Sequence, residues 1–331
     1  MPVLGVVGLG KMGLLHASIL SALSDVEVVV FCEKNSLVRK FAPKVLPTAR
    51  IVANVTEMRG FHLDGVYVTT PPASHFPVVE TLYSQGIATN IFIEKPLAAN
   101  YAEALQLCQL AGNWGGVNMV GYHKRFSMIF RKAKSILEED GLGKVTDFEA
   151  YAYSSDFYDA PQAMAQAVAR GGVLRDSGCH AVDLVLWFLG EVTVDSSVIK
   201  SPLTGDQEDS AAALVRTSEG IPGEIKLSSC MQAYRLPQIG LHLRGTKGSL
   251  HVNEDKVELL LNGGKSHTWY RHDFDDSVPF LLADPEYCRE DQRFVDALLH
   301  GAAVESNFQV AAGVEQLIDH IQQAAGPLFG R

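Results

Sequence analysis

The chain has 331 residues, a length that suggests two domains, because single cores rarely grow beyond roughly 250–300 residues. Apolar residues make up 47% and charged residues 20%, the balance of an ordinary globular protein. The net charge is −10 and no stretch is strongly basic, which argues against nucleic acid as a partner, because phosphate binding needs clustered Lys and Arg.

The sequence also argues against a membrane or secreted protein. No run of 18 apolar residues is present, so we expect no transmembrane helix. Met1 is followed almost at once by an apolar strand without a basic segment, so we expect no signal peptide. The five cysteines are widely spaced and include no C-x-x-C pair, which is typical of reduced thiols in a cytoplasmic protein.

The first third of the chain alternates short apolar strands with helices. The expected strands are Val3–Val7, Val26–Cys32, Arg50–Val52, Gly65–Thr69, Asn90–Ile93 and Asn118–Gly121. The expected helices are Leu14–Leu23, Ser36–Phe41, Ser74–Gln85 and Tyr101–Ala111. This alternation predicts an α/β Rossmann domain with a parallel, doubly wound sheet over residues 1–121.

The rhythm changes after residue 121. A helix is expected at Ser127–Glu138, a strand at Lys144–Tyr153, an irregular or helical stretch at 154–170, a helix at Cys179–Phe188, strands through 193–261, and helices at Cys288–Leu299 and Val310–Ala324. Within Gly223–Met231 and Gln238–Arg244 apolar and polar residues alternate, the period of a sheet with one face on a core. This pattern predicts an α+β domain over residues 122–331.

A dinucleotide-binding pattern follows the first strand. Gly8-Leu9-Gly10-Lys11-Met12-Gly13 is G-x-G-x-x-G, and Glu33 ends the next strand twenty positions after Gly13. Gly8 permits the tight turn, Gly10 lets the backbone approach a pyrophosphate, and Gly13 lets helix and strand pack closely. The N-terminus of the following helix offers free N–H groups to the phosphates.

Five further segments are similar to one known family. They are Val68-Thr69-Thr70-Pro71-Pro72-Ala73-Ser74-His75, Glu94-Lys95-Pro96, Gly121-Tyr122-His123-Lys124-Arg125-Phe126, the run from Gly171 to Asp183, and Gly245-Thr246-Lys247-Gly248-Ser249-Leu250. In this order and spacing they resemble the glucose–fructose oxidoreductase / inositol dehydrogenase / MocA (Gfo/Idh/MocA) family over nearly the whole chain. The Glu-Lys-Pro and Asp-x-x-x-His pieces together are quite specific.

The resemblance implies a fold and a set of roles. The N-terminal domain should bind NAD(H) or NADP(H), the C-terminal domain should carry a large, mostly antiparallel open sheet, and the active site should lie between them. Lys95 would be the catalytic lysine, in contact with cofactor and substrate, and Asp176 and His180 would be its catalytic partners and further substrate contacts.

The same resemblance implies the remaining contacts. Thr69, Pro71 and His75 would lie along the cofactor, and Glu94 near the nicotinamide ribose. His123 and Arg125 would face the substrate, although His123 stands where many members carry Asn or a similar small polar residue.

Each of these residues also has a structural interpretation. Asp176 is a candidate helix N-cap, and His180 a candidate core histidine. Arg175 either meets an anionic substrate group or forms a structural ion pair. Asp183 is interpreted as a packing residue. Cys179 is interpreted as a small buried residue at a helix start.

These features predict a hydride transfer between a nicotinamide cofactor and a secondary alcohol of a polyol, sugar or nucleotide sugar. The alternative is a non-catalytic sensor, because relatives with this fold include a sugar-pathway repressor that binds nucleotide without turnover. The presence of Lys95, Asp176 and His180 together favours the enzyme. Either His180 or a neutral Lys95 could act as the base.

The cofactor and the assembly follow from further residues. Glu33 favours NAD over NADP because its carboxylate repels a 2′-phosphate, and Lys34 with Arg39 is the competing signal for NADP. The remaining histidines show no metal-ligand spacing, so we expect no metal. A homodimer or homotetramer is expected, because in the family the open sheet face commonly pairs with another subunit.

Overall fold

The structure is a computed structural model that describes residues 1–44, 46, 48–158, 163–201, 203, 207–274, 277–278 and 283–325. The chain forms two compact units. The first comprises Met1–His123 with Ser277–Ala312, and the second Lys124–Asp276 with Gly313–Arg331. A segment near the C-terminus therefore completes the first unit.

The first unit is built on a six-stranded sheet with the order β3-β2-β1-β4-β5-β6. All of its neighbouring strands are parallel. The strands are β1 (Val3–Val7), β2 (Glu27–Cys32), β3 (Arg50–Val52), β4 (Gly65–Val68), β5 (Ile91–Ile93) and β6 (Asn118–Val120). Strands β4 and β5 are buried throughout, as expected for a parallel sheet covered on both faces.

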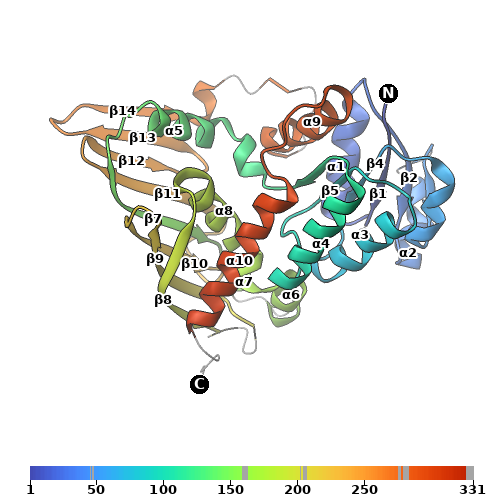
Figure 1. Ribbon diagram of the computed structural model, residues 1–331, viewed down its shortest axis with the longest axis horizontal. Helices are drawn as coiled ribbons and strands as arrows, with labels where there is room; N and C mark the ends of the chain where they lie inside the picture. Colours follow the sequence, from blue (N-terminus) through green and yellow to red (C-terminus); the bar gives the residue numbers. More distant parts are fainter. Residues whose placement is uncertain are drawn as a thin grey trace. The chain divides into compact units, whose positions relative to one another are not determined.

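Helices connect and cover these strands (Figure 1). They are α1 (Lys11–Ala22), α2 (Ser36–Phe41), α3 (His75–Ser84) and α4 (Tyr101–Trp114), with 3-10 turns η1 (Ala42–Lys44), η2 (Val55–Phe61) and η3 (Pro72–Ser74). The 3-10 turn η4 (His123–Phe126) leads from the first unit into the second. Asn35 caps α2 and Asn100 caps α4 by accepting hydrogen bonds from backbone N–H groups, which satisfies donors that the first helical turn leaves open.

The returning C-terminal segment packs on two parts of the first unit. Helix α9 (Pro285–His300) lies beside α1, where Cys288 joins Leu15 and Ile19 in one apolar cluster. Ser306 then fastens the segment to the edge strand β6: its backbone oxygen accepts from Val120 N at 2.8 Å, and its hydroxyl donates to Val120 O at 2.8 Å.

The second unit contains an eight-stranded sheet with the order β14-β13-β12-β11-β7-β10-β9-β8. Its strands are β7 (Val145–Tyr153), β8 (Val192–Lys200), β9 (Ser210–Thr217), β10 (Pro222–Ser228), β11 (Gln238–Gly245), β12 (Gly248–Val252), β13 (Lys256–Leu261) and β14 (Ser266–Tyr270). All neighbouring pairs are antiparallel except β7 with β10.

The two faces of this sheet differ. One face, which includes Ala150, Ile225 and Leu241, is buried, and α8 packs on its strands β7, β10 and β11. The opposite face carries ion pairs such as Lys226 with Glu149 at 2.7 Å. The helices of this unit are α5 (Met128–Glu138), α6 (Ala163–Arg170), α7 (Gly172–Arg175), α8 (Gly178–Leu189) and the part of α10 (Phe308–Ala325) from Gly313 on, with the 3-10 turn η5 (Arg271–Asp273).

The fold class predicted from the sequence is confirmed: a parallel Rossmann sheet comes first and a mostly antiparallel sheet follows. Some boundaries were wrong. The first helix begins at Lys11 rather than Leu14, because Gly10 is its N-cap. In the stretch 154–170 the structure has α6 from Ala163, while 159–162 lie outside the described residues. Among the described residues, no helix has both the length and the apolar character to span a membrane.

A buried ion pair anchors α8 in the second unit. The Arg125 guanidinium donates to Asp183 through Nε at 3.0 Å and Nη2 at 2.7 Å, and it lies over the Trp187 ring. Asp183 is 1% exposed. Burial raises the pKa of the Asp183 carboxyl, and Arg125 acts against that rise. The pair therefore ties the start of the second unit to its central helix.

We expect Asp183→Ala to lower the free energy of unfolding by about 3–5 kcal/mol, because it leaves a buried guanidinium without its carboxylate. The control is Asp195→Ala, which breaks the half-exposed pair with Arg216 and should cost less than about 1 kcal/mol. Urea titrations followed by circular dichroism measure both. Equal losses in the two variants would contradict this account.

Candidate active site

Functional candidates of the first unit follow the carboxyl ends of neighbouring parallel strands. Gly8 follows β1, Glu33 follows β2, Thr69 follows β4 and Glu94 follows β5. The carboxyl ends of parallel strands meet at one edge of a sheet, which is where open α/β sheets bind their ligands. The structure thus brings these predicted residues to one edge.

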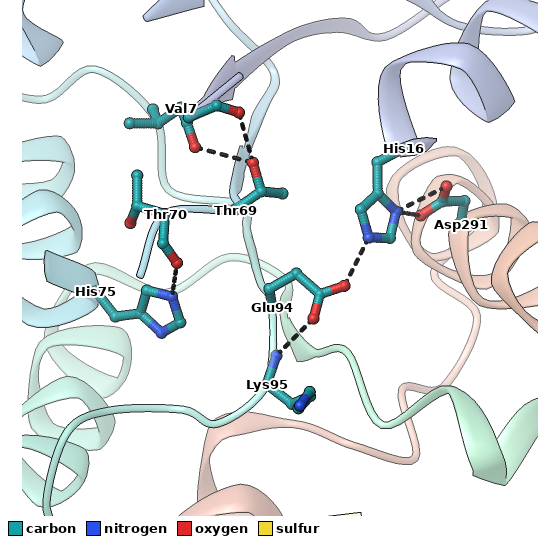
Figure 2. A network of polar contacts seen from close by, with 9 residues as sticks. Val7, His16, Thr69, Thr70, His75, Glu94, Lys95 and Asp291 are labelled. Atoms are coloured by element: carbon teal, nitrogen blue, oxygen red, sulfur yellow. Dashed lines mark hydrogen bonds and ion pairs between the residues drawn. The ribbon is translucent and has the colours of Figure 1, made fainter. Parts of the chain in front are cut away.

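The glycine loop has the geometry that its motif predicted. Gly8 has φ +98°, in the left-handed region that favours glycine. A Cβ on Gly13 would collide with the carbonyl oxygen of Gly8 and lie 2.8 Å from Thr69 Oγ1. The Thr69 hydroxyl is within reach of Val7 O at 3.0 Å and Gly8 O at 2.9 Å (Figure 2). Thr69 therefore supports the loop from the neighbouring strand.

Gly10 leaves the start of α1 open. It is exposed, it is the N-cap of α1, and a Cβ built there would meet nothing within 4 Å. Lys11 and Met12 form the first helical residues behind it. The free N–H groups of this helix start, with the positive end of the helix dipole, fit the pyrophosphate of a nicotinamide dinucleotide.

Glu33 lies against the tip of the same loop. Its carboxylate accepts hydrogen bonds from Leu9 N at 2.8 Å and Asn35 N at 2.7 Å. Arg39 donates to the backbone oxygens of Glu33 at 2.9 Å and Lys34 at 2.6 Å. A carboxylate beside the glycine loop suits the ribose hydroxyls of a dinucleotide, and a guanidinium stands close to it.

His75 links the loops after β4 and β5. It is fully buried, with Nε2 2.7 Å from Thr70 O and Nδ1 2.9 Å from Pro96 O. Burial lowers the pKa of His75, and the two carbonyl contacts act against that effect. Pro71, by contrast, is exposed at the start of η3. His75 therefore joins the two loops that hold Thr69 and Lys95.

Glu94 and Lys95 stand directly after β5, and the Lys95–Pro96 peptide is cis. Glu94 is 7% exposed. One of its carboxylate oxygens accepts from Lys95 N at 3.0 Å, and the other lies 2.9 Å from His16 Nε2 (Figure 2). The Glu94 side chain is thus held inside the first unit.

Two partners in this network were missed by the sequence analysis. His16 lies on α1 and Asp291 on α9, with Nδ1 of His16 2.8 Å from Asp291 Oδ1. The only signal in the sequence was a histidine on the apolar face of the first helix. Asp291 gave no signal, because it is separated from His16 by 275 positions.

The second unit carries the other catalytic candidates near the start of α8. Asp176 lies between α7 and α8, so it does not share a helical face with His180, and the N-cap of α8 is Ser177. Arg170 donates to Asp176 at 3.1 Å and to Asp156 at 3.0 Å. His180 is on the first turn of α8 and is 5% exposed.

Gly178 explains why α8 approaches the sheet closely at this point. A Cβ on Gly178 would lie 2.6 Å from a Leu227 methyl group and 2.7 Å from Val173 O. Only glycine fits there without displacement, so the turn that carries His180 packs directly on β10. Cys179 is fully buried beside it.

The remaining candidates have partners inside their own units. Arg175 binds Glu315 at 3.2 Å and Gln322 at 3.1 Å, which is the structural ion pair considered from the sequence. His123 is buried and stacks on Tyr287 with ring centroids 4.4 Å apart. Among the residues that the structure describes, His, Cys, Asp and Glu form no group of three or more that could hold a metal ion.

Comparison with known proteins agrees with this geometry. Residues 3–122 match the oxidoreductase family with an NAD-binding Rossmann fold, and residues 130–251 match the GFO/IDH/MocA C-terminal domain. Inositol 2-dehydrogenase of Rhizobium meliloti (strain 1021) is 25% identical over 315 residues, which cover 91% of this chain and 89% of the relative.

Two further proteins show the same likeness. Myo-inositol 2-dehydrogenase of Thermotoga maritima is 24% identical over 282 residues, 82% of each chain. A levoglucosan dehydrogenase in complex with NADH and levoglucosan has the same fold, with a TM-score of 0.85 at 20% identity over 98% of this chain and 96% of that one. The chain belongs to the Gfo/Idh/MocA family and is an NAD(P)-dependent dehydrogenase.

Proposed function

We propose that the protein transfers a hydride between NAD and a secondary alcohol of a polyol, sugar or nucleotide sugar, with NADP as the alternative cofactor. The observation that carries this proposal is the position of Lys95. It directly follows β5, at the same sheet edge as the glycine loop after β1 and Glu33 after β2. The named relatives act on inositol and levoglucosan, which favours a cyclic substrate rich in hydroxyl groups.

In this proposal the first unit holds the cofactor. The α1 N-terminus and the glycine loop bind the pyrophosphate, Glu33 binds the ribose hydroxyls, and Thr69, Pro71 and His75 line the path towards the nicotinamide. Glu94 acts near the nicotinamide ribose. A bound, oxidised nicotinamide cofactor would supply the acceptor for a hydride from the carbon that carries the reacting hydroxyl.

Lys95, Asp176 and His180 act on the substrate. A free alcohol keeps its proton at neutral pH, so the site needs a base and a group that stabilises the developing oxyanion. His180 takes the hydroxyl proton, since an imidazole titrates near neutral pH, and Lys95 donates a hydrogen bond to the oxygen. The roles exchange if Lys95 is neutral. Asp176 orients the substrate or Lys95.

The remaining assignments concern the substrate and the wider chain. His123 and Arg125 contribute substrate contacts. Residues 1–121 form the cofactor domain, and 122–331 supply the substrate site and the oligomer interface. The protein works in the cytoplasm, without nucleic acid, membrane or metal ion.

The polar face of the second sheet is the proposed interface of a homodimer or homotetramer. Exposed apolar side chains stand among its ion pairs: Leu214 is 51% and Leu260 52% exposed, and Leu214 lies opposite Glu224 across β9 and β10. Apolar side chains surrounded by polar residues are typical of a surface that a partner covers.

For the chemistry we expect Lys95→Ala to lower kcat by roughly 10²-fold, the scale of one lost acid–base or oxyanion contact. His180→Ala should behave in the same way. Affinity for the cofactor should change much less, because the glycine loop and Glu33 carry most of that binding. Initial rates with NAD and a panel of polyols, sugars and nucleotide sugars measure this, with the exposed Lys265→Ala as the control.

Near-normal turnover of Lys95→Ala on the substrate that the panel identifies would overturn the assignment of the site. Silence of the unmodified protein across the panel, with nucleotide still bound, would favour a sensor instead of an enzyme.

For the cofactor we expect a higher kcat/KM with NAD than with NADP, and Glu33→Ser should lower the preference roughly tenfold, the scale of one hydrogen bond to a charged group. Glu27→Ser is the matched control, because Glu27 begins the same strand at its opposite end. Steady-state rates with both cofactors decide the matter, and a higher kcat/KM with NADP would refute the prediction.

For the assembly we expect sedimentation at micromolar concentration to show species heavier than the 36.0 kDa chain. Leu214→Asp should shift the population towards the monomer, because it places a charge within the proposed interface. Leu299→Asp is the control: it substitutes another partly exposed leucine, on α9 of the first unit. A single monomeric species for the unmodified protein would contradict the prediction.

A further inference from the structure

One buried histidine, His16, lies between α1 and the segment that follows β5. His16 is 0% exposed and stands on α1, three positions after Gly13 of the glycine loop. Its Nε2 is 2.9 Å from Glu94 Oε1, and its Nδ1 is 2.8 Å and 3.0 Å from the two oxygens of Asp291 (Figure 2). The three side chains come from α1, the end of β5 and α9, all within the first unit.

The geometry fits a protonated histidine. An ionised carboxylate only accepts hydrogen bonds, and each ring nitrogen of His16 faces a carboxylate, so both nitrogens donate when Asp291 and Glu94 are ionised. An imidazole that donates through both nitrogens is protonated. Burial by itself lowers the pKa of His16, but Asp291 and Glu94 together raise it well above its usual value. Burial raises the pKa of the Asp291 carboxyl, and the facing His16 acts against that rise.

His16 is surrounded by aromatic rings and by further acids. The rings of Tyr67 and Phe92 lie 5.5 Å and 5.1 Å from that of His16, and the Tyr287 ring lies 6.3 Å away. Two further acids of α9 lie nearby: Glu290 interacts with Glu94, His16 and Asp291, and Glu286 interacts with Glu290. Burial and the nearby Glu94 raise the pKa of the Glu290 carboxyl, which disfavours a further negative charge beside the cluster.

The second oxygen of Glu94 connects this cluster to the catalytic lysine. Glu94 Oε2 accepts a hydrogen bond from the backbone N–H of Lys95 at 3.0 Å. We propose that His16 is a positioning residue which, as an imidazolium oriented by Asp291, holds the Glu94 carboxylate and through it fixes the backbone of Lys95. This inference rests on the proposed role of Lys95.

The arrangement has a consequence for the reaction. A hydrogen bond from a charged donor is stronger than one between neutral groups, and a water-free site strengthens it further. Small displacements of a catalytic group cost rate steeply. Loss of the His16–Glu94 contact should therefore lower kcat, while cofactor affinity should change little, because the glycine loop and Glu33 remain intact.

Two variants separate the two contacts of His16. In His16→Gln the amide nitrogen takes the place of Nε2 and still donates to Glu94. In His16→Asn the amide nitrogen takes the place of Nδ1 and reaches only Asp291. Both variants lose the positive charge, so they should lose thermal stability to a similar extent. We expect kcat to be roughly tenfold higher for His16→Gln than for His16→Asn, the scale of one hydrogen bond to a charged group, with similar KM for NAD.

A second readout needs neither substrate nor cofactor. Hydrogen exchange of the segment 91–97 in the cofactor-free protein reports on the Lys95 amide, whose donated bond slows exchange. The Lys95 amide should stay protected in His16→Gln and exchange faster in His16→Asn. If a His16 variant fails to fold, Glu94→Gln and Glu94→Leu test the link from Glu94 to Lys95: Gln keeps an oxygen that accepts from the Lys95 amide and should preserve protection, and Leu has no acceptor and should lose it.

The possible outcomes are distinct. Equal kcat and equal exchange in the two His16 variants, at equal stability, would overturn the positioning role, because a purely structural histidine makes no distinction between them. Lys95→Ala is measured in parallel. If that variant keeps its turnover, the proposed catalytic role of Lys95 fails, whereas the exchange experiment still tests the link from His16 to the Lys95 backbone.

Discussion

Parallel strands must all end at the same edge of their sheet, and the candidate site of the first unit depends on this constraint. The order β3-β2-β1-β4-β5-β6 places the ends of β1, β4 and β5 next to one another. The glycine loop, Thr69 and Lys95 follow these three strands. Residues almost ninety positions apart in the chain thus reach the same edge of the sheet.

Buried ion pairs then restrict how the helices pack within each unit. His16, Arg125 and Arg175 are each nearly inaccessible and each lies against a carboxylate from a distant part of the chain, namely Asp291, Asp183 and Glu315. Moving such a charge away from its partner leaves an uncompensated ion in a medium of low polarity, at a cost of several kcal/mol. These pairs therefore admit few alternative arrangements of α1 with α9, or of α8 with the chain that precedes α5.

The two units carry different parts of the proposed chemistry. In the first unit the backbone supplies much of the proposed cofactor site. The start of α1 is open at Gly10, and there is no room for a Cβ at Gly13. In the second unit the close approach of α8 to β10 at Gly178 and the pair of Arg170 with Asp176 set the positions of the polar groups. The proposed catalytic partners of Lys95, Asp176 and His180, thus belong to the second unit, whereas the proposed cofactor loop belongs to the first.

The sequence by itself determined the strand–helix alternation of the Rossmann domain, the glycine loop with Glu33, and the Glu-Lys-Pro segment, because these features depend on residues close together in the chain. Gly8, for example, has a left-handed φ because the chain turns there from the first strand towards the first helix, a local requirement. The mostly antiparallel second sheet was predicted from the family resemblance. Tertiary structure alone decided that α9 returns to the first unit and that Asp291 meets His16, that Asp176 lies outside α8, and that Arg175 binds Glu315. Each of these depends on which surfaces pack together over separations of up to 275 positions, and neither periodicity nor motif spacing carries information about such contacts.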